Sequence, residues 1–299
     1  MLAVSLALIV YNLSNHKNKM ATYKINNLEW PYQNINYCGT KISHKRLKIA
    51  IIDTGIDKSA FKALNIKEYN IDSTKFDNQK SMHGTLISSI ICNNSLIKDN
   101  NLLKTLEFIS IKVGDDDNII INSLVKGINL AVSLNADIVN LSVGTYKNSP
   151  DLEKAITGGI KKGVIFVCAS GNDATNQYLY PASYNGVISV SSTDANNNYL
   201  ANNNRNNKII MAAPGEKIPT YINNKKYQKY LDGSSPSTAI VTDVIIILKE
   251  IKDTLKADDI IDIFKKSCRD LGEKGKDNYY GYGIVDFKTA ILYTNNKYN

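Results

Sequence analysis

The stretch Ile49-Ala-Ile-Ile-Asp53-Thr-Gly-Ile-Asp57 leads four apolar residues into a carboxylate and then into a glycine turn. A short, continuously apolar run is typical of a strand that is buried on both faces of a parallel sheet. In an open parallel sheet, ligands bind beyond the carboxyl ends of the strands. Because Asp53 ends this strand, the sequence predicts that its carboxylate lies at the functional edge of the fold.

The rest of the chain alternates apolar strands with helices. We expect strands at 48–52, 106–113, 137–143, 163–169, 186–191 and 208–212, and helices at 84–92, 121–134, 152–162 and 237–252. This alternation predicts an α/β fold with a mainly parallel central sheet covered by helices on both faces. The composition does not break after residue 48, so we expect one domain over residues 26–299 and an N-terminal extension over residues 1–25.

A histidine comes 30 positions after the strand-end carboxylate, at the start of His83-Gly-Thr85. The chain has three histidines, and the other two, His16 and His44, lie in polar stretches flanked by lysine. A lone histidine is usually a surface residue or a satisfied core residue, but this scarcity favours His83 as a general base. The strand-end carboxylate would orient its imidazole, with Asp57, beyond the glycine turn, as the competing candidate.

Ser235 lies in Gly233-Ser-Ser235-Pro236, at the expected start of a long helix. A serine hydroxyl needs a base within hydrogen-bonding reach to become a nucleophile, and a helix N-terminus favours developing negative charge. By itself the segment is equally typical of a helix N-cap. Together with the aspartate and histidine upstream, it completes an Asp-His-Ser order that predicts a serine peptidase.

Asn172 ends the segment Cys168-Ala-Ser-Gly-Asn172, which follows another expected strand. Acyl transfer places negative charge on the carbonyl oxygen of the substrate, and a fixed side-chain amide can donate a hydrogen bond to it. The alternative is an ordinary turn asparagine after glycine. The other motifs favour Asn172 as part of an oxyanion hole.

Between Trp30 and Asp286 the chain resembles the subtilases, the subtilisin-like serine proteases. Beyond the Asp, His and Ser-Gly-Asn motifs, the matching segments are Asn140-Leu-Ser-Val-Gly144, Tyr180-Pro-Ala182, Ala213-Pro-Gly215 and Gly281-Tyr-Gly283. The resemblance implies a subtilisin-like three-layer sandwich and a serine endopeptidase. It implies a triad of Asp53, His83 and Ser235, with Asn172 and the Ser235 backbone N–H as the oxyanion hole.

The same resemblance implies which residues bind the substrate residue that precedes the scissile bond. These are Ser142, Val143 and Gly144 on one side and Ala169, Ser170 and Gly171 on the other. The resemblance also implies a pocket floor near Leu179. The chain between Asn172 and Tyr180 is shorter than in secreted members, however, which leaves the specificity of the pocket open.

Other segments depart from the family pattern. Pro236-Ser-Thr-Ala239 stands where the family usually has Met-Ala-Thr/Ala-Pro, and Leu86-Ile-Ser-Ser follows the histidine in place of His-Val-Ala-Gly. The family's calcium loop aligns poorly with residues 93–101, so a structural calcium ion is left open. No C-x-x-C pair indicates zinc, and we expect no cofactor and no catalytic metal.

The residues before Trp30 are too few for the long pro-domain of secreted subtilases, and the cysteines show no disulfide pattern. In this the chain resembles the leader peptidases of lantibiotic gene clusters, which predicts removal of the leader peptide from a modified bacteriocin precursor. The alternatives are a general intracellular degradative subtilase and a non-catalytic subtilase shell that binds peptides.

Charge and hydropathy bear on partners and location. The net charge is +8, and the lysines are scattered rather than clustered, so we expect an acidic peptide partner and no nucleic acid. We also expect a monomeric protein. The apolar run 2–10 is too short to cross a bilayer as a helix. We therefore expect a cytoplasmic protein, with secretion or membrane association through residues 2–13 as the alternative.

Three adjacent carboxylates, Asp115-Asp-Asp117, follow the expected strand 106–113. If the loop lined the substrate cleft, they would favour basic or polar residues upstream of the scissile bond. The alternative is a solvated turn that touches no substrate.

Overall fold

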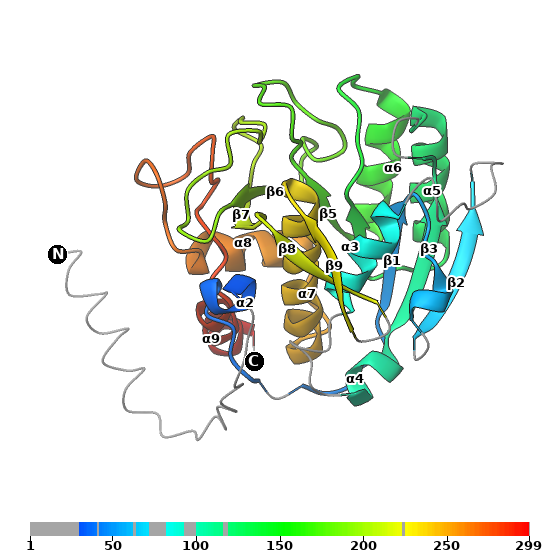
Figure 1. Ribbon diagram of the computed structural model, residues 1–299, viewed down its shortest axis with the longest axis horizontal. Coiled ribbons are helices and arrows are strands. Elements are labelled where there is room, and N and C mark those ends of the chain that lie inside the picture. Colours follow the sequence, from blue (N-terminus) through cyan, green and yellow to red (C-terminus); the bar gives the residue numbers. More distant parts are fainter. Residues whose placement is uncertain are drawn as a thin grey trace.

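The computed structural model describes residues 30–40, 42–61, 64–71, 82–92, 100–115, 119–222 and 225–298 (Figure 1). Within these residues, seven strands form one sheet in the order β2-β3-β1-β4-β5-β6-β7. They are β1 (Lys48–Asp53), β2 (Asn65–Asn70), β3 (Glu107–Lys112), β4 (Ile138–Leu141), β5 (Ile165–Ala169), β6 (Ile188–Thr193) and β7 (Met211–Pro214). Every neighbouring pair is parallel, which confirms the α/β sheet. The expected extension 1–25 lies outside the described residues.

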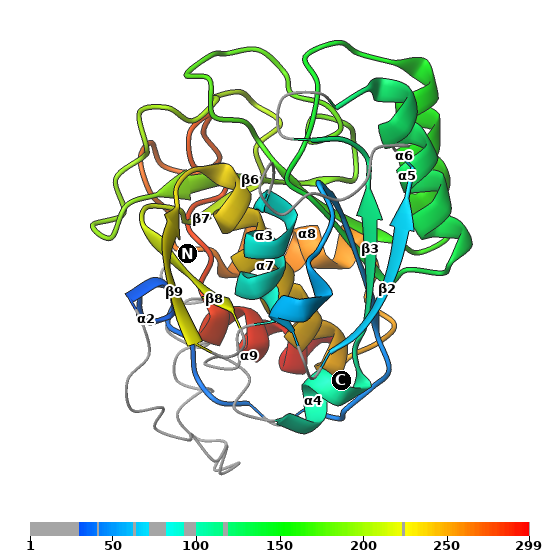
Figure 2. The same cartoon turned by 45° about the vertical axis from the view of Figure 1, so that its right-hand side comes forward.

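Helices cover both faces of this sheet (Figures 1 and 2). On one face lie α5 (Ile121–Ser133) and α6 (Pro150–Lys161), and on the other α3 (His83–Ile91), α7 (Ser234–Ile251), α8 (Ala257–Ser267) and α9 (Phe287–Tyr298). The shorter elements are α2 (Trp30–Asn34), η1 (Lys58–Ala60), α4 (Asn100–Thr105) and an antiparallel hairpin of β8 (Ile218–Ile222) and β9 (Lys225–Leu231). The arrangement is a three-layer sandwich.

The apolar residues of β1 explain why both faces are covered. Successive side chains of a strand point to opposite faces. Ile49 and Ile51 belong to the core that includes α3 and α7, while Ala50 and Ile52 belong to the core that includes α5 and α6. A strand without a polar side chain between Ile49 and Ile52 is therefore stable only between two helical layers.

The strand register brings the ends of three strands to one level. Ile52 of β1 pairs with Leu141 of β4, and Leu141 pairs with Cys168 of β5. Asp53, Ser142 and Ala169, the next residue along each of these segments, therefore lie at the same sheet edge.

The central helix α7 carries a buried acid. Asp243 is 1% exposed, and neither of its carboxylate oxygens has a hydrogen-bond partner among the residues that the structure describes. Burial raises the pKa of this carboxyl well above its ordinary value. Burial first, and then repulsion from the ionised form of Asp243, raise the pKa of the Tyr37 hydroxyl and of the Cys92 thiol. Burial therefore favours the protonated form of Asp243 in the folded protein.

Replacing Asp243 by asparagine, which cannot ionise, is expected to stabilise the protein at alkaline pH. Above the ordinary carboxyl pKa the unfolded chain ionises while folded Asp243 stays protonated, so stability falls by about 1.4 kcal/mol per pH unit. Urea unfolding in a Ser235→Ala background, which prevents self-digestion, should give similar midpoints for Asp243→Asn and its parent at about pH 4 and a higher midpoint for Asp243→Asn at about pH 8.

The matched control is Asp258→Asn, at an exposed position in the first turn of α8. It should not change the pH dependence of the midpoint. Equal midpoints of Asp243→Asn and its parent at both pH values would show that Asp243 folds as an ordinary ionised carboxylate.

Candidate active site

The carboxylate at the end of β1 meets the histidine at the start of α3. His83 Nδ1 lies 2.8 Å from Asp53 Oδ1 and 3.0 Å from Oδ2. Asp53 is buried, and its Oδ1 also accepts a hydrogen bond from Thr54 N at 2.7 Å. This geometry places the proton of a neutral imidazole on Nδ1 and leaves Nε2 as the basic nitrogen.

The Asp and His motifs interlock through their threonines. Thr54 Oγ1 accepts a hydrogen bond from Gly84 N at 3.0 Å, and Thr85 Oγ1 accepts one from Asp57 N at 2.9 Å. A Cβ atom at position 84 would lie 2.4 Å from the Gly55 carbonyl oxygen, so only glycine allows α3 to start this close to β1. The threonines are positioning residues that the sequence analysis did not identify, although both lie inside the quoted motifs.

The competing carboxylate has a different role. Asp57 is the N-cap of η1, and its Oδ1 accepts a hydrogen bond from Ser59 N at 2.9 Å. Asp57 therefore caps η1, and Asp53 is the carboxylate that contacts the imidazole.

Ser235 is the second residue of α7, a helix that packs against α3 (Figure 2). The helix begins at Ser234, three residues before the expected start, with Gly233 as N-cap at φ 102°. Ser235 is 7% exposed, and its Oγ lies 3.5 Å from the Ser142 carbonyl oxygen. A backbone N–H in the first turn of a helix has no partner within that helix, so the Ser235 N–H can donate to a developing oxyanion.

The side-chain amide of Asn172 has a defined orientation. Its Oδ1 accepts hydrogen bonds from Ser234 N at 2.8 Å and from Ser234 Oγ at 3.0 Å. The same hydroxyl accepts from Gly171 N at 3.2 Å. With Oδ1 taken by two donors, Nδ2 is the group that can donate to a substrate. Any Cβ at Gly233 would come within 2.8 Å of this amide, which accounts for the glycine there.

Replacing Asn172 by alanine is expected to lower kcat by roughly 100- to 1000-fold with a much smaller change in KM, because the lost donor acts on the transition state. Ser234→Ala removes one of the two bonds that hold the amide, and should lower kcat by only about fivefold, the equivalent of about 1 kcal/mol. Ser234→Thr keeps the hydroxyl and should retain kcat. Steady-state kinetics on one peptide substrate measure all three, and an unchanged kcat in Asn172→Ala would mean that another donor serves the oxyanion.

The two predicted binding segments leave neighbouring strands. Ser142, Val143 and Gly144 follow β4, and Ala169, Ser170 and Gly171 lie at and just after the end of β5. Ser142 Oγ lies 3.4 Å from both the Ser235 carbonyl oxygen and Asn140 Oδ1. The sequence-predicted residues therefore converge on one end of the sheet.

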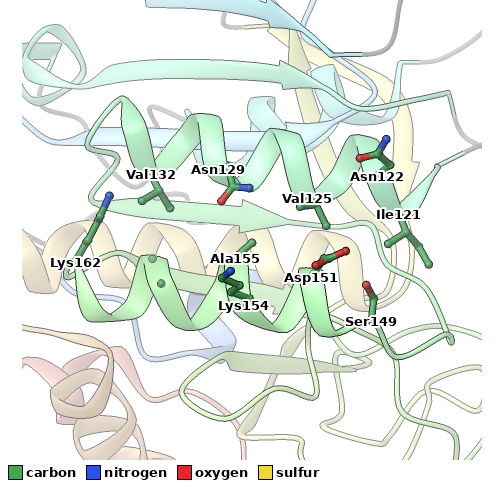
Figure 3. Close-up of a pocket in the computed structure, with 12 residues that line it drawn as sticks. Ile121, Asn122, Val125, Asn129, Val132, Ser149, Asp151, Lys154, Ala155 and Lys162 are labelled. Atoms are coloured by element: carbon green, nitrogen blue, oxygen red, sulfur yellow. The ribbon is translucent and has the colours of Figure 1, made fainter.

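Other parts of the molecule bear on the remaining expectations. A cavity of about 670 Å³ lies between α5 and α6 and is lined by none of the candidate site residues (Figure 3).

No cluster of three or more potential metal-ligating side chains occurs within the described ranges, and most of the calcium-loop segment 93–101 lies outside them. Lys112 Nζ binds the Asp115 carboxylate, while Asp116 and Asp117 are outside the described residues.

Comparison with known proteins agrees with this geometry. A model of the subtilase family matches residues 44–283. The minor extracellular protease Epr of Bacillus subtilis (strain 168) is 30% identical over 255 residues, which make up 83% of this chain and 39% of Epr. This chain thus spans well under half the length of Epr. The major intracellular serine protease of the same organism is 30% identical over 231 residues, 71% of each chain.

A solved structure shows that the fold is shared with a known protease. A lanthipeptide protease superposes with a TM-score of 0.71 at 22% sequence identity, covering 83% of this chain and 88% of that one. An α/β sheet with an Asp-His pair and a serine at a helix N-terminus has the groups that a hydrolase with a serine nucleophile requires. The chain belongs to the subtilase family and is a serine endopeptidase.

Proposed function

We propose that this protein is a processing endopeptidase that removes the leader peptide from a modified bacteriocin precursor of the lantibiotic type. The hydrogen bonds between His83 Nδ1 and the buried Asp53 carboxylate, at the sheet edge where β1, β4 and β5 end, support the catalytic part of the proposal.

The mechanism follows from the positions of four groups. Ser235 Oγ attacks the scissile carbonyl carbon as His83 Nε2 takes its proton. The Asp53 carboxylate stabilises the imidazolium that forms, and Asn172 Nδ2 and the Ser235 N–H donate to the oxyanion. The imidazolium then gives its proton to the leaving amine. Water, deprotonated by the same imidazole, hydrolyses the acyl-enzyme.

Two observations support the proposed substrate class. The solved lanthipeptide protease shares this fold over most of its length. The net charge of +8 favours encounter with an acidic peptide. The four cysteines all lie in the described part of the chain and form no disulfide, which fits a protein that works in the cytoplasm. Processing of one precursor peptide fits the same location.

A second candidate function is general intracellular degradation. The observation in its favour is the 30% identity to the major intracellular serine protease over 71% of both chains.

The location of the protein also has an alternative, since Epr is an extracellular enzyme. No helix within the described residues is both long enough and apolar enough to cross a membrane.

One assay separates these functions. The purified protein is incubated with lantibiotic-type precursor peptides that carry their leaders and, in parallel, with casein, using Ser235→Ala as the blank. Leader processing predicts one cut at the leader–core boundary and little casein hydrolysis. Many cuts in casein and in both parts of the precursor would support degradation instead. Peptide binding without any cut in either substrate would indicate the non-catalytic shell.

A further inference from the structure

The pocket that we expect for the residue before the scissile bond would lie between two backbone segments. One segment follows β4 and contains Gly144, and the other follows β5 and contains Gly171. The paired ends of these strands, Leu141 and Cys168, set the spacing between the segments. Ser235 touches the first segment through Ser142 and Ser234 touches the second, so the slot between them opens at the nucleophile.

The side chain of Leu179 lies between these two segments, against both glycines. A Cβ atom built on Gly144 would lie 2.9 Å from Leu179 Cγ and 3.1 Å from its Cδ2. A Cβ atom built on Gly171 would lie 3.3 Å from the same Cδ2. One methyl group of Leu179 therefore lies against both glycines, and it spans the distance between the two walls.

The backbone around Leu179 keeps it in this position. Tyr180 and Thr145 exchange two hydrogen bonds of 2.8 Å, which tie the residue after Leu179 to the residue after Gly144. The Leu179 carbonyl oxygen accepts a hydrogen bond from Ser183 N at 3.0 Å. These hydrogen bonds fix the backbone of Leu179 beside the segment that contains Gly144.

A second set of contacts joins the two segments through Tyr146 and Asp173, two residues beyond Gly144 and Gly171. The Tyr146 hydroxyl binds the Asp173 carboxylate and accepts a hydrogen bond from Asn204 Nδ2 at 2.8 Å. Asn204 is fully buried, and its Oδ1 accepts from Asp173 N at 3.0 Å. Burial, and then the bond to Asp173, raise the pKa of Tyr146 to about 12, so the phenol stays protonated and the link persists at neutral pH.

We propose that Leu179 shortens this pocket, so that the protease selects glycine, alanine or serine at the position before the scissile bond. The inference rests on the proposed catalytic role of Ser235, and it names the substrate class of the same site. A large side chain would need the volume that the isobutyl group of Leu179 fills, and the Tyr146–Asp173–Asn204 link resists widening of the slot.

The test uses diphenyl peptidyl phosphonates that differ only in the side chain next to phosphorus, methyl or benzyl. Ser235 Oγ forms a bond to phosphorus, the P–O bond to one phenoxy group breaks, and phenol leaves with the serine proton. Intact-protein mass gives the rate. We expect the wild type to react roughly 100-fold faster with the alanine-like probe, and Leu179→Ala and Leu179→Gly to speed the phenylalanine-like probe by a similar factor.

Leu130→Ala, a truncation at a half-buried leucine of α5, is the matched control and should keep the wild-type ratio. Equal rates with both probes in the wild type, or an unchanged ratio in both Leu179 variants, would overturn the inference. Failure of both probes to label the wild type would overturn it together with the role of Ser235. A preference for the alanine-like probe without cleavage of any precursor would support the pocket and contradict leader processing.

Discussion

Replacing Ser235 by alanine is expected to reduce kcat by roughly a million-fold, because in the proposed mechanism this hydroxyl alone forms the acyl-enzyme and the other groups act through it. Ser235 lies at the N-terminus of α7, with its Oγ close to the Ser142 carbonyl oxygen, so the missing hydroxyl leaves the helix and the binding segments in place. Hydrolysis of a fluorogenic peptide and labelling by a serine-directed fluorophosphonate should both disappear, while peptide binding measured by fluorescence anisotropy should persist.

Two controls make the result specific to this serine. Ser133→Ala removes an exposed hydroxyl at the end of α5 that binds only the Leu130 carbonyl among the described residues, and should retain full activity. Ser234→Ala tests the neighbouring serine, which holds the Asn172 amide. If Ser235→Ala kept activity within about tenfold of the wild type while Ser234→Ala lost it, the nucleophile would be Ser234.

The sequence was sufficient to predict the central sheet because its strands are continuously apolar. The predicted strands and helices each match an element of the structure, with β7 starting at Met211 rather than at residue 208. The edge strand β2 was not predicted, because Lys67 and Glu68 lie among its exposed residues and it pairs with a single neighbour. In such a strand, backbone pairing rather than an apolar pattern determines the structure.

Helices α8 and α9 were also missing from the sequence-based prediction. In α8 the buried face consists of a few residues, including Ile260, Ile263 and Phe264, among charged neighbours. Such a helix depends on the surface that it packs against, and here α8 packs against α9. The sequences of α8 and α9 do not reveal the surface against which each helix packs, so neither helix could be predicted from its own sequence.

The candidate site also contains residues that the sequence predicted and residues that it did not. Asp53, His83 and Ser235 lie in short motifs whose chemistry can be read locally, and the structure brings Asp53 and His83 into direct contact. The roles of Ser234 and Leu179 depend on contacts with residues distant in the sequence, at Gly144, Gly171 and Asn172. No local pattern marks such contacts, so the orientation of the amide and the depth of the pocket appear only in three dimensions.

Replacing Asp53 by asparagine is expected to lower kcat by roughly 10,000-fold with little change in folding. Oδ1 of Asp53 accepts the Thr54 N–H, so the asparagine should keep its oxygen at that position. Its NH₂ group then lies where Oδ2 is now, 3.0 Å from His83 Nδ1. An N–H directed at Nδ1 favours the tautomer with its proton on Nε2, and that imidazole cannot accept the serine proton.

The measurement compares Asp53→Asn with Asp57→Asn, which changes the carboxylate that caps η1. Asp57→Asn should retain activity within about tenfold, because asparagine is also a good N-cap. Thermal unfolding in a Ser235→Ala background should give similar midpoints for both variants and their parent. Since the asparagine of Asp53→Asn retains the size of the side chain and the bond from Thr54 N, a large loss of kcat without a loss of stability would identify a role in orienting and charging His83. Near-normal kcat in Asp53→Asn together with a collapse in Asp57→Asn would assign that role to Asp57 instead.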